Sequence, residues 1–299
     1  MGMKKATLSA VALLSLFILS SWGYNAHHRI NRMAVYALPK GMFAFYKANI
    51  DFITEHAITA DKRRYVDSAE IPRHFFNADR YGKAPFKTIP RKWKDFNKRY
   101  TRDTMLKHGT LPWTIQQRYY WLVKAFKEHD TTSILRNSAD LAHYVADAHV
   151  PLHTVLNHDG QLTGQDGIHG LWESRLPELF ADRYRYPIKK AKYINNPLTQ
   201  AFVICQRSFG KADSVLRLER LLNKRFPADK KYTMEKRGQR KVKVYSPEYC
   251  RAYHSLLKGM VERQMRSAMY EAASYWFSAW VDAGQPDLNK LIKTSATKN

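Results

Sequence analysis

Apolar residues recur every three to four positions along most of the chain, which is the spacing of an amphipathic helix. Segments 30–38 and 113–127 both carry such a face, and a proline follows the first. The hydroxyl residues 131–133 offer N-caps for another helix, which should end near Val150 because Pro151 comes next. Each of these segments is therefore predicted to be helical.

The last third of the chain continues this pattern. Ser246 followed by Pro247 is typical of a helix start, and the apolar spacing then runs on toward Gly284. Strict alternation, the mark of a strand, is nearly absent. Segments 75–91 and 157–170 contain glycine or proline without any period and are expected to be loops. We find no repeat and no linker, so the prediction is an all-α fold, a single multi-helix domain.

The first 21 residues have a different character from the rest. Lys4 and Lys5 precede an apolar stretch over residues 6–20. A basic start followed by a short apolar run is typical of a secretory signal and is too short for a membrane span. We expect residues 1–21 to be removed, leaving residues 22–299 as an exported domain, either periplasmic or secreted.

Charge points to the kind of partner. Lys and Arg total 50 against 26 Asp and Glu, a formal net charge of +24. Such an excess favours nucleic acid, anionic lipid headgroups or other phosphate-bearing molecules, although a basic protein without a polyanion partner fits it too. Residues 229–243 are the most basic stretch. They suggest an exposed hairpin or a disordered loop, which is either solvated surface or a grip on a polyanion.

Two cysteines, Cys205 and Cys250, are the only ones in the chain. In an oxidising compartment they could form one disulfide, or they could be two separate buried thiols. Spacing leaves both alternatives open. They lack the close spacing of a thiolate metal site, so neither is a candidate ligand.

Histidines and carboxylates cluster near the middle of the chain. His143 and Asp147 are four residues apart, as are His169 and Glu173, so each pair shares one face of a helix. His153 comes just after Pro151, where the chain can turn back toward the helix end. Imidazole and carboxylate ligands without thiolates suit zinc.

Upstream, Asp61, His74 and the run from Trp22 to His27 complete a recognisable pattern. From Trp22 to Glu173 the chain resembles the superfamily of bacterial zinc-dependent phospholipase C and the single-strand-specific nucleases. The resemblance implies an all-α fold with three zinc ions. The implied ligand sets are Asp61, His74, His143 and Asp147 for the first ion; His153, His169 and Glu173 for the second; and the α-amine and carbonyl of Trp22 with His27 and a bridging Asp147 for the third.

The same resemblance implies roles beyond metal binding. Asp61 would orient or deprotonate the attacking water, and Arg64 would clamp the scissile phosphate. Phe75 would stack on a base. Asn77 stands where the nucleases have a base-contacting Asp, which puts base preference in doubt. His28, His149 and His158 match no ligand position.

The sequence features point to two different substrate classes. The five-residue step from Trp22 to His27, together with Arg64, Phe75 and the basic charge, resembles the nucleases. Glu173 and its short preceding interval resemble the phospholipases. The interval from His74 to His143 fits neither and suggests an insertion rich in Lys and Arg. We therefore expect a single-strand nuclease or 3′-nucleotidase acting on DNA or RNA, then a phospholipase C, and third a non-catalytic polyanion-binding protein.

Overall fold

The computed structural model describes residues 24–187 and 189–296, and most of them are helical. The helices are α2 (Tyr24–Ala34), α3 (Lys40–Ala48), α4 (Ile50–Glu55), α5 (Thr59–Arg63), α6 (Pro85–Thr88), α7 (Trp93–Arg99), α8 (Arg102–His108), α9 (Leu111–Lys127), α10 (Thr131–His149), α11 (Ile168–Gly170), α12 (Leu176–Phe180), α13 (Pro197–Asn223), α14 (Pro247–Leu256), α15 (Met260–Asp282) and α16 (Asn289–Ala296). The all-α class is confirmed in this coarse form. The expected signal segment 1–21 lies outside the described residues.

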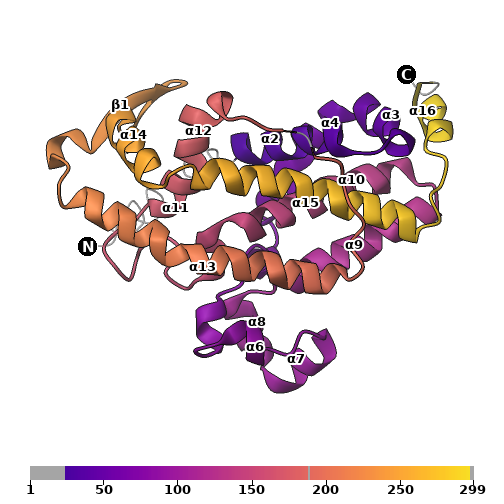
Figure 1. Ribbon diagram of the computed structural model, residues 1–299, viewed down its shortest axis with the longest axis horizontal. Helices are drawn as coiled ribbons and strands as arrows, with labels where there is room; N and C mark the ends of the chain where they lie inside the picture. Colours follow the sequence, from indigo (N-terminus) through magenta and orange to yellow (C-terminus); the bar gives the residue numbers. More distant parts are fainter. Residues whose placement is uncertain (1–23, 188, 297–299) are drawn as a thin grey trace, which may run out of the picture.

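Four long helices, α9, α10, α13 and α15, lie side by side and form the body of the molecule (Figure 1). Their shared core is rich in large aromatic side chains. Trp276 of α15 is fully buried, stacks on Tyr46 with ring centroids 5.1 Å apart, and donates its indole N–H to the Ser138 carbonyl oxygen at 2.9 Å. These contacts tie α15 to α10 and fix the position of α10, which carries two of the predicted ligands.

Helix α10 ends where the sequence predicted, at the step from Val150 to Pro151. Its start differs by one residue. The Asp130 carboxylate accepts a hydrogen bond from the Ser133 backbone N–H and is the N-cap, so the prediction of a hydroxyl cap at 131–133 is wrong. A carboxylate also suits the positive end of the helix dipole, and the three hydroxyl residues continue as the first turn.

The C-terminal helix also starts as predicted, with the Ser246 hydroxyl accepting from the Tyr249 N–H. It does not run unbroken to Gly284. Lys258 and Gly259 have φ angles of 48° and 75°, a left-handed conformation that ends one helix and separates α14 from α15. The prediction of one long helix is wrong because this glycine lies within an otherwise periodic apolar pattern.

The interval between His74 and His143, where we expect an insertion, holds a group of short helices. It forms α6, α7 and α8, which project from one side of the helical body (Figure 1). Residues 78–81 and 85–88 within it form short helices, so the prediction of a loop over 75–91 is wrong there. A buried Phe96 packs between Trp113 and Tyr100 and anchors this projection to α9. The other predicted loop, 157–170, is confirmed as far as Gly167; α11 begins at the next residue, Ile168.

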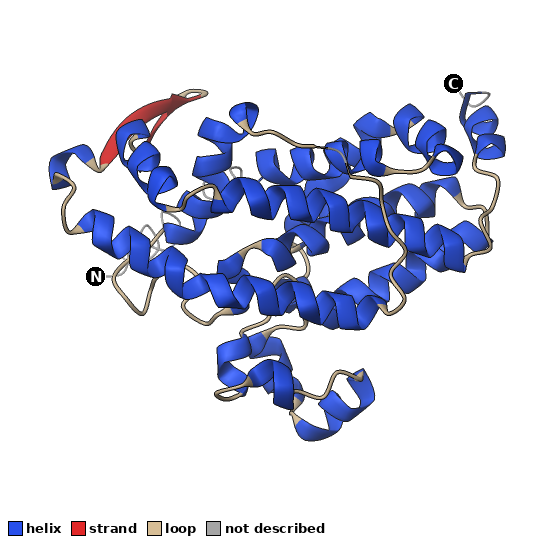
Figure 2. Cartoon of the chain, in the orientation of Figure 1, coloured by secondary structure: helices blue, strands red, loops and turns tan. Residues whose placement is uncertain are grey.

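A single antiparallel hairpin, β1 (Tyr232–Arg237) and β2 (Arg240–Tyr245), is the only sheet in the described residues (Figure 2). The basic segment 229–243 is thus an ordered hairpin and not a disordered loop.

Cys205 and Cys250 are free thiols, and each is buried in a different apolar cluster. Of the two alternatives, separate thiols are therefore confirmed and a disulfide is not formed. In the described residues, no helix combines the length and apolarity needed to cross a membrane.

Candidate metal centre

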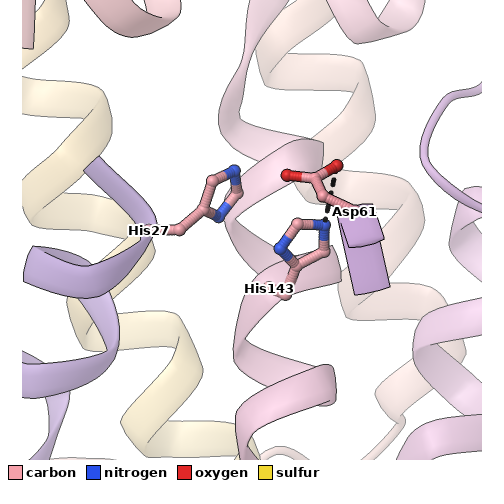
Figure 3. Close-up of side chains that lie close together, drawn as sticks. All are labelled: His27, Asp61 and His143. Carbon is pink, nitrogen blue, oxygen red and sulfur yellow. Dashed lines mark ion pairs between the residues drawn. The ribbon is translucent and has the colours of Figure 1, made fainter. Parts of the chain in front are cut away.

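Eight of the nine predicted metal ligands fall within the described residues, and the structure brings all eight together. They come from seven separate elements: His27 from α2, Asp61 from α5, His74 directly after a 3-10 turn, His143 and Asp147 from α10, His153 from the 3-10 turn Pro151–Thr154, His169 from α11 and Glu173 from the π-turn Leu171–Arg175. Figure 3 shows three of them converging from different helices. Trp22 lies outside the described residues.

In the first group His74, His143 and Asp147 place their donor atoms within 4.8 Å of one another, and Asp61 adjoins them, within 4.8 Å of His143 and of His27. His143 Nε2 lies 3.1 Å from His74 Nδ1, 3.2 Å from Asp147 Oδ2 and 3.8 Å from Asp61 Oδ1. Ligand atoms about 2.1 Å from a tetrahedral ion lie roughly 3.4 Å from one another. The observed separations bracket that value, so the set predicted from the resemblance has the dimensions of a single metal site.

The second group is formed by three side chains. His153 Nε2 is 3.1 Å from His169 Nε2 and 3.2 Å from Glu173 Oε2, and His169 Nε2 is 2.6 Å from the same oxygen. The four-residue spacing of His169 and Glu173 survives although the helix changes from α to π between them. Two imidazoles and a carboxylate leave room for a further ligand at a tetrahedral ion.

A third group forms around His27 and joins the other two. His27 Nε2 lies 3.5 Å from Asp147 Oδ1 and 3.2 Å from Glu173 Oε1. Asp147 therefore turns one oxygen to the first group and the other to His27, as the resemblance implied. Glu173 does the same between the second group and His27, which the sequence did not reveal. Two shared carboxylates make one continuous centre out of three groups.

Hydrogen bonds from the backbone fix how the imidazoles face this centre. His143 Nδ1 donates to the Ala57 carbonyl oxygen at 2.8 Å, and His153 Nδ1 donates to the carbonyl oxygen of His74. A neutral imidazole that donates from Nδ1 presents a lone pair at Nε2. On His74 the ligand atom is Nδ1, and its Nε2 lies 3.7 Å from Glu70 Oε1. The two backbone hydrogen bonds orient His143 and His153, as partners of metal-binding histidines do, whereas His74 Nε2 has no hydrogen-bond partner in the described residues.

The electrostatics of the centre favour positive charge. Burial alone would lower the pKa of His143 and of His153, but the neighbouring carboxylates outweigh it and raise each pKa to about 9. Burial would raise the pKa of Asp147 and of Glu173, yet the surrounding histidines hold both well below the usual range. The centre thus collects protons, and metal ions compete with protons for the same donor atoms.

The donor chemistry fits zinc. Every donor in the eight-residue set is an imidazole nitrogen or a carboxylate oxygen, and both cysteines lie outside the set. The His27 Nδ1 atom is buried and has no hydrogen-bond partner in the described residues. His28, His149 and His158 belong to none of the groups, in agreement with their assignment as non-ligands.

A hollow of about 460 Å³ opens over the centre. Its lining includes both shared carboxylates together with Asp61 and Arg64. The Arg64 guanidinium lies 2.9 Å from Asp61 Oδ1 and is one-third exposed. Burial would lower its pKa, but Asp61, Asp147 and Glu173 raise it, so Arg64 carries a permanent positive charge at the edge of the centre. A cation beside the centre suits an anionic ligand.

The two predicted base contacts are placed differently. Phe75 is half-buried and packs against Gly109, while Asn77 is only 3% exposed and donates its backbone N–H to the His108 carbonyl oxygen. Neither lines the hollow, so stacking by Phe75 and base contact by Asn77 stay predictions. The lining instead includes Tyr65, which is 45% exposed and which sequence reasoning missed. Its position directly after Arg64 was the available signal.

No protein-family profile matches this chain, and no curated protein sequence matches it. The interpretation of the centre therefore rests on its own geometry and on the sequence resemblance.

Proposed function

We propose that this protein is a zinc-dependent phosphodiesterase of the phospholipase C and single-strand nuclease type, and that its substrate is single-stranded nucleic acid or a 3′-nucleotide. The observation that carries the proposal is the sharing of Asp147 and Glu173 between groups. A carboxylate that bridges two sites holds their ions close together, as cleavage of a phosphodiester by clustered metal ions requires.

Three Zn²⁺ ions, when bound, would polarise the phosphate oxygens and lower the pKa of a coordinated water to about 7. Asp61 lies at the edge of the first group with its side chain 13% exposed to the hollow, and its carboxylate would orient that water. Arg64 can reach a phosphate oxygen from the same wall, with two parallel N–H groups for two oxygens. These two residues are the proposed catalytic pair.

Charge supports nucleic acid as the substrate. The chain carries a formal net charge of +24, and Arg64 adds a cation at the edge of the hollow. A polyanion gains from such a field along its whole length, whereas a zwitterionic lipid headgroup gains little. The leader-like residues 1–21 further lead us to propose that the mature protein is exported, periplasmic or secreted.

Phospholipid hydrolysis is the second candidate, and one observation favours it. Tyr65, Val66 and Ile71, which are 45%, 87% and 46% exposed, form an apolar rim near the metal centre, and the first and last also line the hollow. Exposed apolar rims of this kind occur where proteins meet membranes. Because the excess of positive charge is large, we place nucleic acid before phospholipid as the proposed substrate.

Three assays on the purified mature protein test the proposal. Single-stranded DNA, single-stranded RNA and phosphatidylcholine vesicles are offered in parallel, and bound metal is counted. We expect about three zinc ions per chain and cleavage of the nucleic acids, both abolished by EDTA and restored by zinc. Cleavage of lipid alone would select the phospholipase. A metal-loaded protein that binds DNA without cutting it would leave only a polyanion-binding role.

A further inference from the structure

A second hollow lies directly beside the one over the metal centre. It measures about 310 Å³ and is formed on one side by α11 and on the other by the β1–β2 hairpin. Gly167 and Gly170 line both hollows. The two spaces therefore meet along a ridge that ends at these glycines.

The ridge presents bare backbone. Gly170 has ordinary helical angles, and a Cβ atom built on it would meet nothing within 4 Å. Gly167 has a φ of +88°, and a Cβ there would lie 3.5 Å from the Tyr245 hydroxyl oxygen. Because neither residue has a side chain, an extended ligand can pass from the metal centre to the hairpin without an obstacle at these positions.

The hairpin face beyond the ridge carries two tyrosines at one end and three lysines farther along the strands. Its register pairs Tyr232 with Tyr245, Met234 with Lys243, and Lys236 with Lys241, and these pairs project from the same face. Lys243 Nζ lies 4.4 Å from the centre of the Tyr232 ring. Tyrosines thus lie nearest the ridge, with lysines following along the strands.

The lysines on this face are not neutralised by the protein. Lys236, Lys241 and Lys243 are exposed, and none makes an ion pair with another described residue. The one acidic residue of the hairpin, Glu235, faces the other way and is held by Arg175 and Arg237. The face therefore keeps a local excess of positive charge.

We propose that the glycine ridge and this hairpin face form a strand-binding track, which carries a single-stranded nucleic acid away from the scissile phosphate over several nucleotides. An unpaired base stacks on the half-buried Tyr232, which the buried Tyr245 supports from below with ring centroids 4.9 Å apart, and the three lysines contact the phosphates. This inference rests on the proposed phosphodiesterase function and deepens it. The enzyme is then specific for strands long enough to cross the ridge, and mononucleotides and dinucleotides use the metal hollow alone.

The first test removes the three charges. Lys236→Gln, Lys241→Gln and Lys243→Gln are combined, and a matched control combines Lys40→Gln, Lys124→Gln and Lys127→Gln, which change three exposed lysines of α3 and α9 at the other end of the molecule. The KM for a 20-residue oligothymidylate should rise about tenfold in the hairpin variant only. The KM and kcat for dithymidine monophosphate should not change in either.

Salt dependence provides an independent readout. Each phosphate contact on a single strand contributes about 0.7 to the slope of log affinity against log salt, so loss of three contacts should reduce the slope by about 2. Binding of the labelled 20-mer to the zinc-loaded protein is measured by stopped-flow fluorescence anisotropy, before cleavage proceeds. If the proposed enzymatic function fails but the slope difference persists, the track stands on its own.

The second test blocks the ridge. Gly170→Leu places a side chain where both hollows meet. Gly210→Leu is the matched control, since Gly210 is also helical and free of neighbours within 4 Å of a Cβ, and it is exposed where Gly170 is half-buried. The KM for the 20-mer should rise at least fivefold for Gly170→Leu and remain unchanged for Gly210→Leu.

Three results would overturn the track: an unchanged KM and salt slope in the lysine variant, an equal loss on dithymidine monophosphate and on the 20-mer, or a loss of binding to anionic phosphatidylserine vesicles with unchanged binding of the 20-mer. The last would assign the hairpin to a membrane surface. If Gly170→Leu does not fold, as judged by circular dichroism, the lysine variant alone decides.

Discussion

Helix α10 contributes to two buried clusters of charge that are composed in opposite ways. One is the metal centre, to which it supplies His143 and Asp147. The other, here called the arginine cluster, comprises Arg63, Glu70, Arg73, Arg118 and Asp140. In the arginine cluster three guanidinium groups surround two carboxylates. In the metal centre three carboxylates have one guanidinium, that of Arg64, and otherwise only histidines.

The arginine cluster is balanced by the protein itself. The Asp140 carboxylate accepts two hydrogen bonds from Arg63, at 2.9 and 3.1 Å, and a third contact comes from Arg118 at 3.1 Å. Burial would raise the pKa of Glu70, but Tyr144, Arg63 and Arg73 outweigh it and lower the pKa to about 2. Buried charges with such partners need no further ion.

The candidate metal centre has one fixed guanidinium, that of Arg64, for three carboxylates, and this is the main difference between the two clusters. Uncompensated buried carboxylates cost free energy unless a cation is supplied. Without metal, His143 and His153 supply part of this charge, since their raised pKa keeps them protonated, and metal ions would take the place of these protons. The two clusters share buried carboxylates but differ in their cations, so the same substitution should have different consequences in each.

The sharpest contrast is the same substitution made twice on one helix. Asp147→Asn removes the shared carboxylate and should lower turnover on single-stranded DNA by about 10²–10³-fold, with at least one zinc ion lost. Asp140→Asn, two turns earlier, should leave zinc content and turnover within about twofold. Equal turnover in the two variants would refute the distinction between the clusters.

Removal of metal by EDTA should act on the metal centre alone, yet it should destabilise the whole domain. If each ion is present at about a thousand times its Kd, binding contributes roughly 4 kcal/mol per ion, and loss of one ion lowers Tm by roughly 10 °C. Differential scanning calorimetry with and without EDTA measures this shift. The shift should shrink in Asp147→Asn and keep its full size in Asp140→Asn; the reverse pattern would contradict the assignment.

Stability in the metal-free state tests the arginine cluster. Asp140→Asn leaves Arg118 buried without its carboxylate and should lower the free energy of unfolding by about 2–3 kcal/mol. This is less than for a fully buried ion pair because Arg63, the other partner of Asp140, is partly exposed. Asp182→Asn, at an exposed ion pair with Arg29, is the control and should change it by less than about 0.5 kcal/mol. Urea unfolding in EDTA gives both values.

Glu70 is where the clusters meet, since Oε1 lies 3.7 Å from His74 Nε2. Glu70→Gln keeps the side-chain shape but removes the charge behind a metal ligand. Zinc affinity should fall about 10–100-fold, the range for partners of ligating histidines. Competition with a chromophoric chelator measures it. An unchanged affinity would show that Glu70 serves the arginine cluster alone.

The sequence predicted the grouping of the candidate ligands better than it predicted the bounds of the helices around them. Spacing alone paired His143 with Asp147 and His169 with Glu173, and the resemblance supplied Asp61 and His27. All are close together in the structure. The reason is that a metal site constrains residue type, and four-residue spacing survives small changes in helix geometry.

What could not be predicted depends on contacts between distant segments. Nothing local reveals that Glu173 reaches His27, 146 residues away. The break at Gly259 and the short helices within 75–91 depend on tertiary packing that overrides local patterns. The ordering of the basic hairpin depends on Arg175, whose ion pair with Glu235 is visible only in three dimensions.

The polarity of α10 also affects the metal centre. Its aligned peptide dipoles leave about half a negative charge at the C-terminal pole, where His143 and Asp147 occupy the last two turns. A positive ion held there gains about 0.3–1 kcal/mol from the backbone alone. The same ligands on a helix of opposite polarity would meet the repulsive pole, so the path of the main chain itself selects for cations.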